Sequence, residues 1–176
     1  MLKAAAVLLN WKRSHNLPVI VQSLKAVPAI ASIHIWDNSG ELNPHAFPGC
    51  RVHHSQSNVY TLGRFIAASR VDCDTVYTQD DDVLVNNVAE LVELHANNQT
   101  DIVAGLTPGH YRVEARQKPW LQLGWAGVFR REWVGVLNVW RDFYGEDSLL
   151  QRKADRIFTI LHGRNHPVPA NVTPLR

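Results

Sequence analysis

Residues 75–82 read TVYTQDDD, a short apolar strand that runs directly into three adjacent aspartates. Three neighbouring carboxylates repel one another unless a cation or a set of hydrogen-bond donors offsets their charge. Carboxylate oxygens at the end of a strand suit Mg²⁺ or Mn²⁺, usually with a phosphate completing the coordination shell. The simpler alternative is a solvated loop in which one aspartate caps the next helix. We therefore interpret Asp80, Asp81 and Asp82 as a candidate ligand site at the end of a buried strand.

Apolar runs that predict strands alternate with amphipathic segments that predict helices on both sides of this motif. The expected strands lie at residues 5–9, 33–36, 51–54, 75–78, 102–104 and 125–129. The expected helices begin near residues 17, 62, 87 and 148, and Asn16 is expected to cap the first of them. This alternation predicts an α/β fold, a single domain over residues 1–176 with a mostly parallel central sheet flanked by helices. Ligands of such sheets bind at the carboxyl ends of the strands.

The composition excludes several classes of protein. A chain of 176 residues with 45% hydrophobic side chains can bury a core, which excludes intrinsic disorder. A net charge of +2 without a clustered basic face does not favour a nucleic-acid binder. No apolar stretch is long enough to predict a transmembrane segment, and the first residues do not fit a signal peptide. Cys50 and Cys73 match neither a disulfide scaffold nor a zinc spacing, so we expect a cytoplasmic protein.

Polar residues follow the other predicted strands as well. Asp37 and Asn38 come directly after the strand at 33–36 and can hydrogen-bond a base or a ribose, or can simply form a turn with the following Ser-Gly. Arg13 follows the first strand, and Arg64 lies one turn into the second helix. Each arginine can pair with a diphosphate, although a lone arginine is more often a solvated surface charge.

The last third of the chain offers further candidates. Glu146 and Asp147 stand just before the final helix, where a carboxylate acts either as an ordinary N-terminal cap or as a catalytic group. Residues 107–123 form a long irregular segment with several basic and aromatic side chains, which is often a functional loop. Three more side chains can complete a metal shell or hold a phosphate, namely His162, Arg164 and His166.

Taken together, these pieces resemble a GT-A glycosyltransferase. They are most similar to the exostosin-type transferase domain, with the broader family 2 transferases behind it. The similarity lies in several pieces in family order, namely residues 6–13, 33–40, 64, 76–82, 102–105, 127–129 and 145–150. The resemblance covers most of the chain, and its specificity comes from the order of the pieces because short aspartate clusters are common.

The resemblance implies a role for each candidate residue. Asp82, together with Asp80, would bind Mn²⁺ or Mg²⁺, and Asp80 and Asp81 would contact the ribose and the sugar. The base and ribose would be held by Asp37 and Asn38, with Asn10, Arg13 and Arg64 nearby. Asp147 and Glu146 would act at the reacting centre. Residues 1–105 would then form the nucleotide-sugar half, and residues 106–176 the acceptor half, shaped by 107–123 and Trp125.

The activity implied is the metal-dependent transfer of a sugar, of hexosyl or N-acetylhexosaminyl type, from a UDP-sugar to a hydroxyl acceptor. The acceptor is a glycan, lipid, protein or nucleic acid. One alternative is a haloacid-dehalogenase-like phosphatase with Asp80 as nucleophile and Asp82 as acid/base. That motif normally follows the first strand, whereas here other strands precede it. A second alternative is a non-catalytic sugar-nucleotide-binding module, which need not retain Glu146 and Asp147.

Overall fold

The structure, a computed structural model, describes residues 2–98, 100–106, 120–145 and 148–175. Its strands are β1 (Ala4–Asn10), β2 (Ile30–Asp37), β3 (Cys50–His54), β4 (Thr75–Asp80), β5 (Val83–Val85), β6 (Ile102–Leu106), β7 (Gly127–Arg130), β8 (Asn165–Pro169) and β9 (Val172–Pro174). Its α-helices are α1 (Leu17–Lys25), α2 (Leu62–Ala68), α3 (Val88–Asn97), α5 (Gly135–Tyr144) and α6 (Ser148–His162). Short 3₁₀ turns lie at η1 (Ser14–Asn16), η2 (Pro44–Ala46) and η3 (Arg131–Val134).

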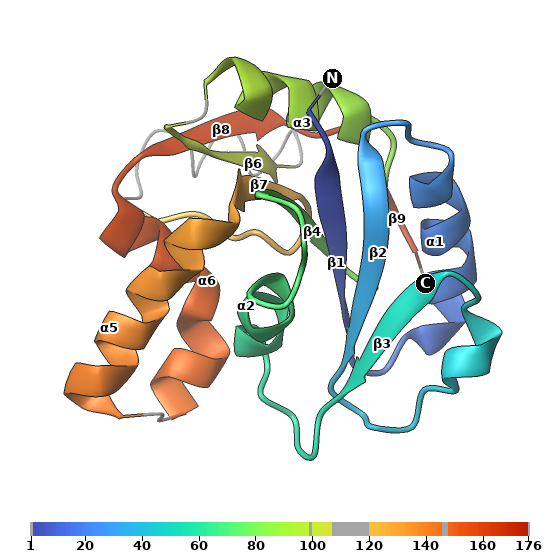
Figure 1. Ribbon diagram of the computed structural model, residues 1–176, viewed down its shortest axis with the longest axis horizontal. Helices are drawn as coiled ribbons and strands as arrows, with labels where there is room; N and C mark the ends of the chain where they lie inside the picture. The colour runs from blue at the N-terminus through green and yellow to red at the C-terminus, as the bar shows by residue number, and fades with distance from the viewer. Residues whose placement is uncertain (1, 99, 107–119, 146–147, 176) are drawn as a thin grey trace.

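Seven strands form the central sheet in the order β3-β2-β1-β4-β7-β6-β8 (Figure 1). β1 pairs in parallel with β2 and β4, β2 in parallel with β3, and β6 in parallel with β8. β7 is antiparallel to both of its neighbours, β4 and β6. All seven residues of β1 are buried, as expected of a strand that is covered on both faces. The predicted α/β fold with a mostly parallel sheet flanked by helices is confirmed.

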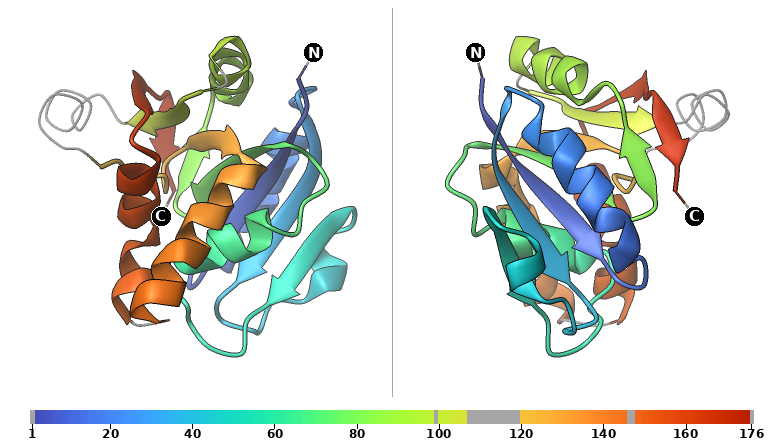
Figure 2. Two further views of the ribbon diagram at one scale, coloured as in Figure 1. Left: turned by 60° about the vertical axis from the view of Figure 1, so that its left-hand side comes forward. Right: turned by 90° about the vertical axis from the view of Figure 1, so that its right-hand side faces the viewer.

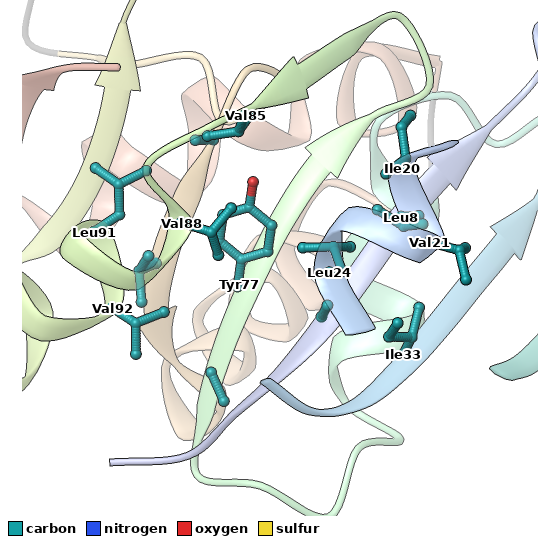
Figure 3. Packing of buried hydrophobic residues seen from close by; sticks show 14 of the residues in the cluster. Leu8, Ile20, Val21, Leu24, Ile33, Tyr77, Val85, Val88, Leu91 and Val92 are labelled. Atoms are coloured by element: carbon teal, nitrogen blue, oxygen red, sulfur yellow. The ribbon is translucent and has the colours of Figure 1, made fainter. Parts of the chain in front are cut away.

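Helices cover the sheet on both faces (Figure 2). On one face, apolar residues of α1 and α3 pack against the sheet around Leu8 and Tyr77 (Figure 3). On the other face, α2, α5 and α6 pack around a cluster that includes Phe65, Phe129 and Phe158. Buried polar residues also stand at or next to the carboxyl ends of β1, β2 and β4, namely Asn10, Asp37 and Gln79.

Four features differ from the expectation. Helix α5 and the edge strand β8 were not predicted, and the predicted strand at 125–129 is β7, which begins at Gly127. Asn16 does not cap α1, because its backbone is helical and its side chain makes no capping hydrogen bond. Its amide is used elsewhere, as described below. The predicted helix over 148–162 is confirmed, and Gly163 follows it with a φ of +74°, the left-handed conformation that ends many helices.

The carboxyl ends of β1, β2 and β4 lie side by side. In the strand register Asn10 is opposite Asp37, and Leu9 is opposite Asp80. Neighbouring strands lie about 4.8 Å apart, so the loops that follow these strands surround one region of the sheet edge. Among the helices that the structure describes, none has both the length and the apolar character needed to cross a membrane.

Candidate functional site

The aspartate triplet lies where β4 ends. Asp80 is the last residue of β4, and Asp81 and Asp82 form the turn into β5. About a third of the side chain is exposed at Asp80 (33%) and at Asp82 (36%), whereas Asp81 is buried. Gln79 connects the two sides of this turn. Its side-chain N–H donates to the backbone oxygen of Val83 at 2.8 Å, and its side-chain oxygen accepts from the Tyr77 hydroxyl at 2.7 Å. The three carboxylates thus share one turn but have different surroundings.

Asp81 holds the loop that follows β1. Its Oδ2 accepts hydrogen bonds from the backbone N–H groups of Trp11 at 2.9 Å and Arg13 at 3.2 Å. Its Oδ1 accepts from Nη1 of Arg13 at 3.3 Å. The side-chain amide of Asn16 donates to the backbone oxygen of Asp81 at 2.9 Å, which is why this residue is not available as a helix cap. Because both of its oxygens are engaged, Asp81 ties the β1 loop to the aspartate turn.

Asp82 is the one of the three carboxylates with a buried oxygen that is still free to accept a ligand. Its Oδ2 lies 3.4 Å from Nη1 of Arg13, but its Oδ1 is buried and has no hydrogen-bond partner. Burial raises the pKa of Asp82, and the nearby Asp80 and Asp81 raise it further, while Arg13 opposes the rise. A buried carboxylate oxygen without a donor is costly unless a ligand or an ion satisfies it.

These residues fit a divalent cation that takes most of its ligands from a bound molecule. Within the described residues, no group of three or more His, Cys, Asp or Glu side chains is placed to hold a metal ion. Mg²⁺ and Mn²⁺ sites in nucleotide-binding proteins often use only one or two carboxylates, with phosphate oxygens and water completing the shell. The free Oδ1 of Asp82 is a hard oxygen ligand of that kind, and the partly exposed Asp80 is its neighbour.

Arg64 is a fully buried guanidinium that contacts Asp80. Its Nη2 donates to Oδ1 of Asp80 at 2.6 Å, and its Nη1 donates to the Thr78 hydroxyl at 3.3 Å. Its Nε forms an ion pair with Oδ1 of Asp155 in α6 at 3.0 Å. Burial works against the charged form, but the two carboxylates raise the pKa of Arg64 above its usual value. In this arrangement Arg64 orients Asp80 and does not itself reach the surface.

Segment 121–124 closes the other side of Asp80. The backbone N–H of Asp80 donates to the backbone oxygen of Gly124 at 2.6 Å. A Cβ atom on Gly124 would come within 2.2 Å of Oδ2 of Asp80, so only glycine allows the backbone to lie this close to the carboxylate. Further along α6, Asp155 accepts from the N–H of Leu123 at 3.0 Å, and Thr159 accepts from the N–H of Leu121 at 3.0 Å.

Asp37 organises the loop after β2. Its Oδ1 accepts hydrogen bonds from the Asn10 amide, from the Ser39 hydroxyl and from the Ser39 N–H, and its Oδ2 accepts from the N–H of Leu42 at 2.9 Å. Nδ1 of His54 lies 3.1 Å from the same Oδ2. Burial alone would raise the pKa of Asp37, but these donors together lower it, so the carboxylate is ionised. Asp37 and Asn10 therefore act as one buried unit that shapes the loop over residues 38–42.

Asn38 connects β2 to the loop before α2. Its Oδ1 accepts from the indole N–H of Trp36 at 3.0 Å and from the N–H of Val59 at 3.1 Å. Its amide donates to the backbone oxygen of Tyr60, a residue with a φ of +52°. A non-glycine residue in this left-handed conformation needs support from its surroundings, which Asn38 supplies.

The loops after β1 and β2 enclose a hollow at the sheet edge. It is lined by Trp11, Lys12, Ser14, Ser39, Glu41, Leu42 and Asn43. Trp11 presents an indole that is 41% exposed, and the Lys12 ammonium lies 5.6 Å from the centre of that ring. An exposed indole beside backbone and hydroxyl groups can stack on a planar base while the polar groups bind its edges. Asp37 and Asp81 fix the two loops that form this hollow.

Eight predicted residues thus lie at one sheet edge, namely Asn10, Arg13, Asp37, Asn38, Arg64, Asp80, Asp81 and Asp82. Glu146 and Asp147 lie outside the described residues, as do 107–119 of the predicted acceptor loop. His162 is not near the triplet: its Nε2 lies 3.1 Å from the backbone oxygen of Thr100, which precedes β6 at the opposite edge of the sheet. Its ring stacks on Trp133 at 4.0 Å between centroids.

Two residues of the site were missed. Asp155 and Gly124 both contact the surroundings of Asp80, but neither stands in a short motif. The sequence does contain one indication of a buried role for Asp155, because this carboxylate lies beside the apolar stripe of the last helix, between Ala154 and Phe158. A charge in that place is almost always paired when it is buried.

We find no protein-family model and no curated protein that matches the sequence. The fold, however, matches solved structures of TarS from S. aureus. One TarS crystal structure aligns with a TM-score of 0.62 and 13% identity over 96% of this chain and 35% of that chain. The 1–349 fragment aligns with a TM-score of 0.62 alone and 0.66 in complex with UDP, at 11% identity in both cases.

These similarities show the fold. The TarS structures share a GT-A-like fold with this chain, so the predicted GT-A-like architecture is confirmed. The likeness does not distinguish the exostosin-type from the family 2 transferases. The chain spans 35% of one TarS chain and 59% of the two 1–349 chains.

Proposed function

We propose that this chain is a metal-dependent glycosyltransferase that moves a sugar from a UDP-sugar to a hydroxyl acceptor. The observation that carries the proposal is the buried Oδ1 of Asp82, which has no hydrogen-bond partner and lies at the strand edge of a GT-A-like fold. The neighbouring TarS structure in complex with UDP supports a uridine nucleotide as the ligand. The transfer would be of hexosyl or N-acetylhexosaminyl type, in the cytoplasm.

The base and ribose would bind in the hollow between the loops after β1 and β2. Trp11 would stack on the base, and the loop fixed by Asp37 would present the N–H and hydroxyl groups of residues 39–43 to it. Asn10 and Asn38 would act by holding this loop in place, since their side chains bind Asp37, Trp36 and Tyr60. Because Asp37 is buried, its role would be to shape the loop that binds the base, not to contact the base itself.

The diphosphate would lie over the aspartate turn. Asp82 and Asp80 would hold Mn²⁺ or Mg²⁺, which when bound neutralises charge on the leaving diphosphate. Arg13 is half-exposed beside Asp81 and Asp82 and would contribute a second positive charge to the same phosphates. Asp80 would be held in position by Arg64, so that its exposed face points to the metal and the ribose.

The acceptor would approach from the side of Trp125, next to Gly124 and Asp80. A positioned carboxylate can take the proton of an acceptor hydroxyl or stabilise a cationic sugar. We assign that role to Asp147 with Glu146 on the resemblance alone.

The experiment is thermal unfolding with UDP, GDP or CMP, each in Mn²⁺ or in EDTA. UDP with Mn²⁺ should stabilise the protein by about 2.7 kcal/mol at a hundredfold excess over Kd, because it binds only the native state. Asp82→Asn should remove the Mn²⁺-dependent part of the shift. Asp72→Asn is the matched control, because that carboxylate is 83% exposed and pairs with the exposed Arg51.

Release of UDP from UDP-glucose or UDP-N-acetylglucosamine then tests turnover. The absence of any nucleotide shift would contradict the proposal. A UDP shift without turnover would favour the binding-module alternative. Hydrolysis of p-nitrophenyl phosphate that is lost in Asp80→Asn would favour the phosphatase.

A further inference from the structure

We propose that Asp155, a buried carboxylate of α6, is a positioning residue that sets the orientation of Asp80 and thereby the affinity of the site for metal-bound nucleotide. This inference rests on the proposed function, because it concerns the same site. Two separate chains of contacts lead from Asp155 to Asp80, and they reach different atoms of that residue.

The first route runs through Arg64. Asp155 Oδ1 pairs with Nε of the guanidinium at 3.0 Å, and Nη2 of the same group donates to Oδ1 of Asp80 at 2.6 Å. The contact between Asp155 and Nε is an ion pair without the geometry of a hydrogen bond, and because a guanidinium is planar and rigid, the charge that holds its Nε side also restricts the direction in which Nη2 points. Arg64 is fully buried, and the Thr78 hydroxyl is its one neutral side-chain partner among the described contacts.

The second route runs through the backbone. Asp155 Oδ2 accepts the N–H of Leu123 at 3.0 Å, which fixes the residue before Gly124. Gly124 in turn accepts the N–H of Asp80 and lies against Oδ2 of its carboxylate. One side chain of α6 therefore controls both oxygens of Asp80, one through a charged group and one through close packing.

A carboxylate is not needed merely to hold residues 121–124 against α6. Thr159, one turn further along α6, accepts the N–H of Leu121 with a neutral hydroxyl. A buried ion pair contributes little net stability compared with apolar packing of the same volume. The charge at position 155 is therefore explained by what it does to Arg64 and Asp80, not by what it adds to the packing of α6.

The test is the Mn²⁺ enhancement, defined as the UDP affinity in Mn²⁺ divided by the UDP affinity in EDTA. Asp155→Asn keeps an acceptor for Leu123 but removes the charge that anchors Arg64, and should lower the enhancement by about tenfold or more. Asp155→Glu restores the charge and should recover much of it. Thr159→Val removes the acceptor of the Leu121 N–H but leaves the contacts of Asp155 with Leu123 and Arg64 in place, and should leave the ratio unchanged although it lowers stability.

If Asp155→Asn does not fold, Arg64→Lys tests the same bridge. The single ammonium of lysine cannot contact both Asp80 and Asp155, so the Mn²⁺ enhancement should fall by the same amount. A merely structural role for Asp155 would lower stability in the variants while the ratio stayed at its wild-type value, and that result would overturn this inference alone. A wild-type protein that binds UDP equally in Mn²⁺ and EDTA would overturn the proposed metal dependence, and this inference with it.

Discussion

Replacing Gly124 by alanine should disable the site with little change elsewhere. The new Cβ would lie 2.2 Å from Oδ2 and 3.0 Å from Cγ of Asp80, whereas Cβ contacts under 3.0 Å are essentially never seen. The carboxylate has to turn away, but its other oxygen is held by the buried Arg64 at 2.6 Å. Overpacking of this kind costs about 1–3 kcal/mol. For a chain of this size that lowers the melting temperature by about 2–4 °C per kcal/mol.

Thermal unfolding measures both consequences. With saturating UDP and Mn²⁺, the wild-type protein should gain about 2.7 kcal/mol at a hundredfold excess over Kd, while Gly124→Ala should show little of this gain. Gly135→Ala is the matched control, because a Cβ there meets nothing within 4 Å at the start of α5. It should leave binding unchanged and stability unchanged or raised by about 0.4–1 kcal/mol. A Gly124→Ala protein with a full UDP and Mn²⁺ shift would refute the argued geometry of Asp80.

Three further outcomes are expected. Gly63→Ala should destabilise the protein by about 1–3 kcal/mol in urea unfolding, because its Cβ would lie 2.3 Å from the indole of Trp36. Asp37→Asn should cost about 1–3 kcal/mol in the same assay and weaken UDP binding, because an amide places N–H groups where Ser39 and Leu42 already donate. The pKa of His34 is lowered to about 4, chiefly by burial and then by repulsion from His53, so His34 is neutral in the folded protein. The unfolded chain binds a proton at this histidine near pH 6.5, whereas the folded protein does so only near pH 4. The free energy of unfolding should therefore keep its full value above pH 6.5 and fall by up to about 3 kcal/mol as the pH drops to 4. Urea unfolding across this pH range measures the change.

The sheet could be predicted because its inner strands carry their signal locally. Every residue of β1 is buried, so the strand is a continuous apolar run. The edge strand β8 contains Pro167 and Pro169, which argue against a strand in the sequence but are tolerated where only one neighbour, β6, is paired. Helix α5 begins with a glycine and is rich in β-branched and aromatic residues, so its helical form depends on packing against α6 and η3 rather than on propensity.

The site shows the same division between local and distant information. The strand ends identified Asp37 and Asp80 as polar residues at one edge, because the carboxyl ends of parallel strands are adjacent. The partner of each carboxylate comes from a distant segment: Arg13 for Asp82, Arg64 for Asp80, and the side-chain amide of Asn10 for Asp37. Sequence patterns do not specify such pairs, so Arg64 was expected at the ligand although the structure places it beneath Asp80.

The charges around the aspartate turn explain why metal and nucleotide would bind as a pair. Among the described residues, four carboxylates (Asp80, Asp81, Asp82 and Asp155) are linked to two guanidiniums (Arg13 and Arg64), which leaves a formal charge of −2 when all are ionised. A diphosphate brought to this edge without a cation would meet repulsion from the turn, and a cation without the diphosphate would have few protein ligands. By linkage, the factor by which Mn²⁺ raises the affinity for UDP must equal the factor by which UDP raises the affinity for Mn²⁺. The excess negative charge is therefore suited to a site that selects the metal–nucleotide complex over either component alone.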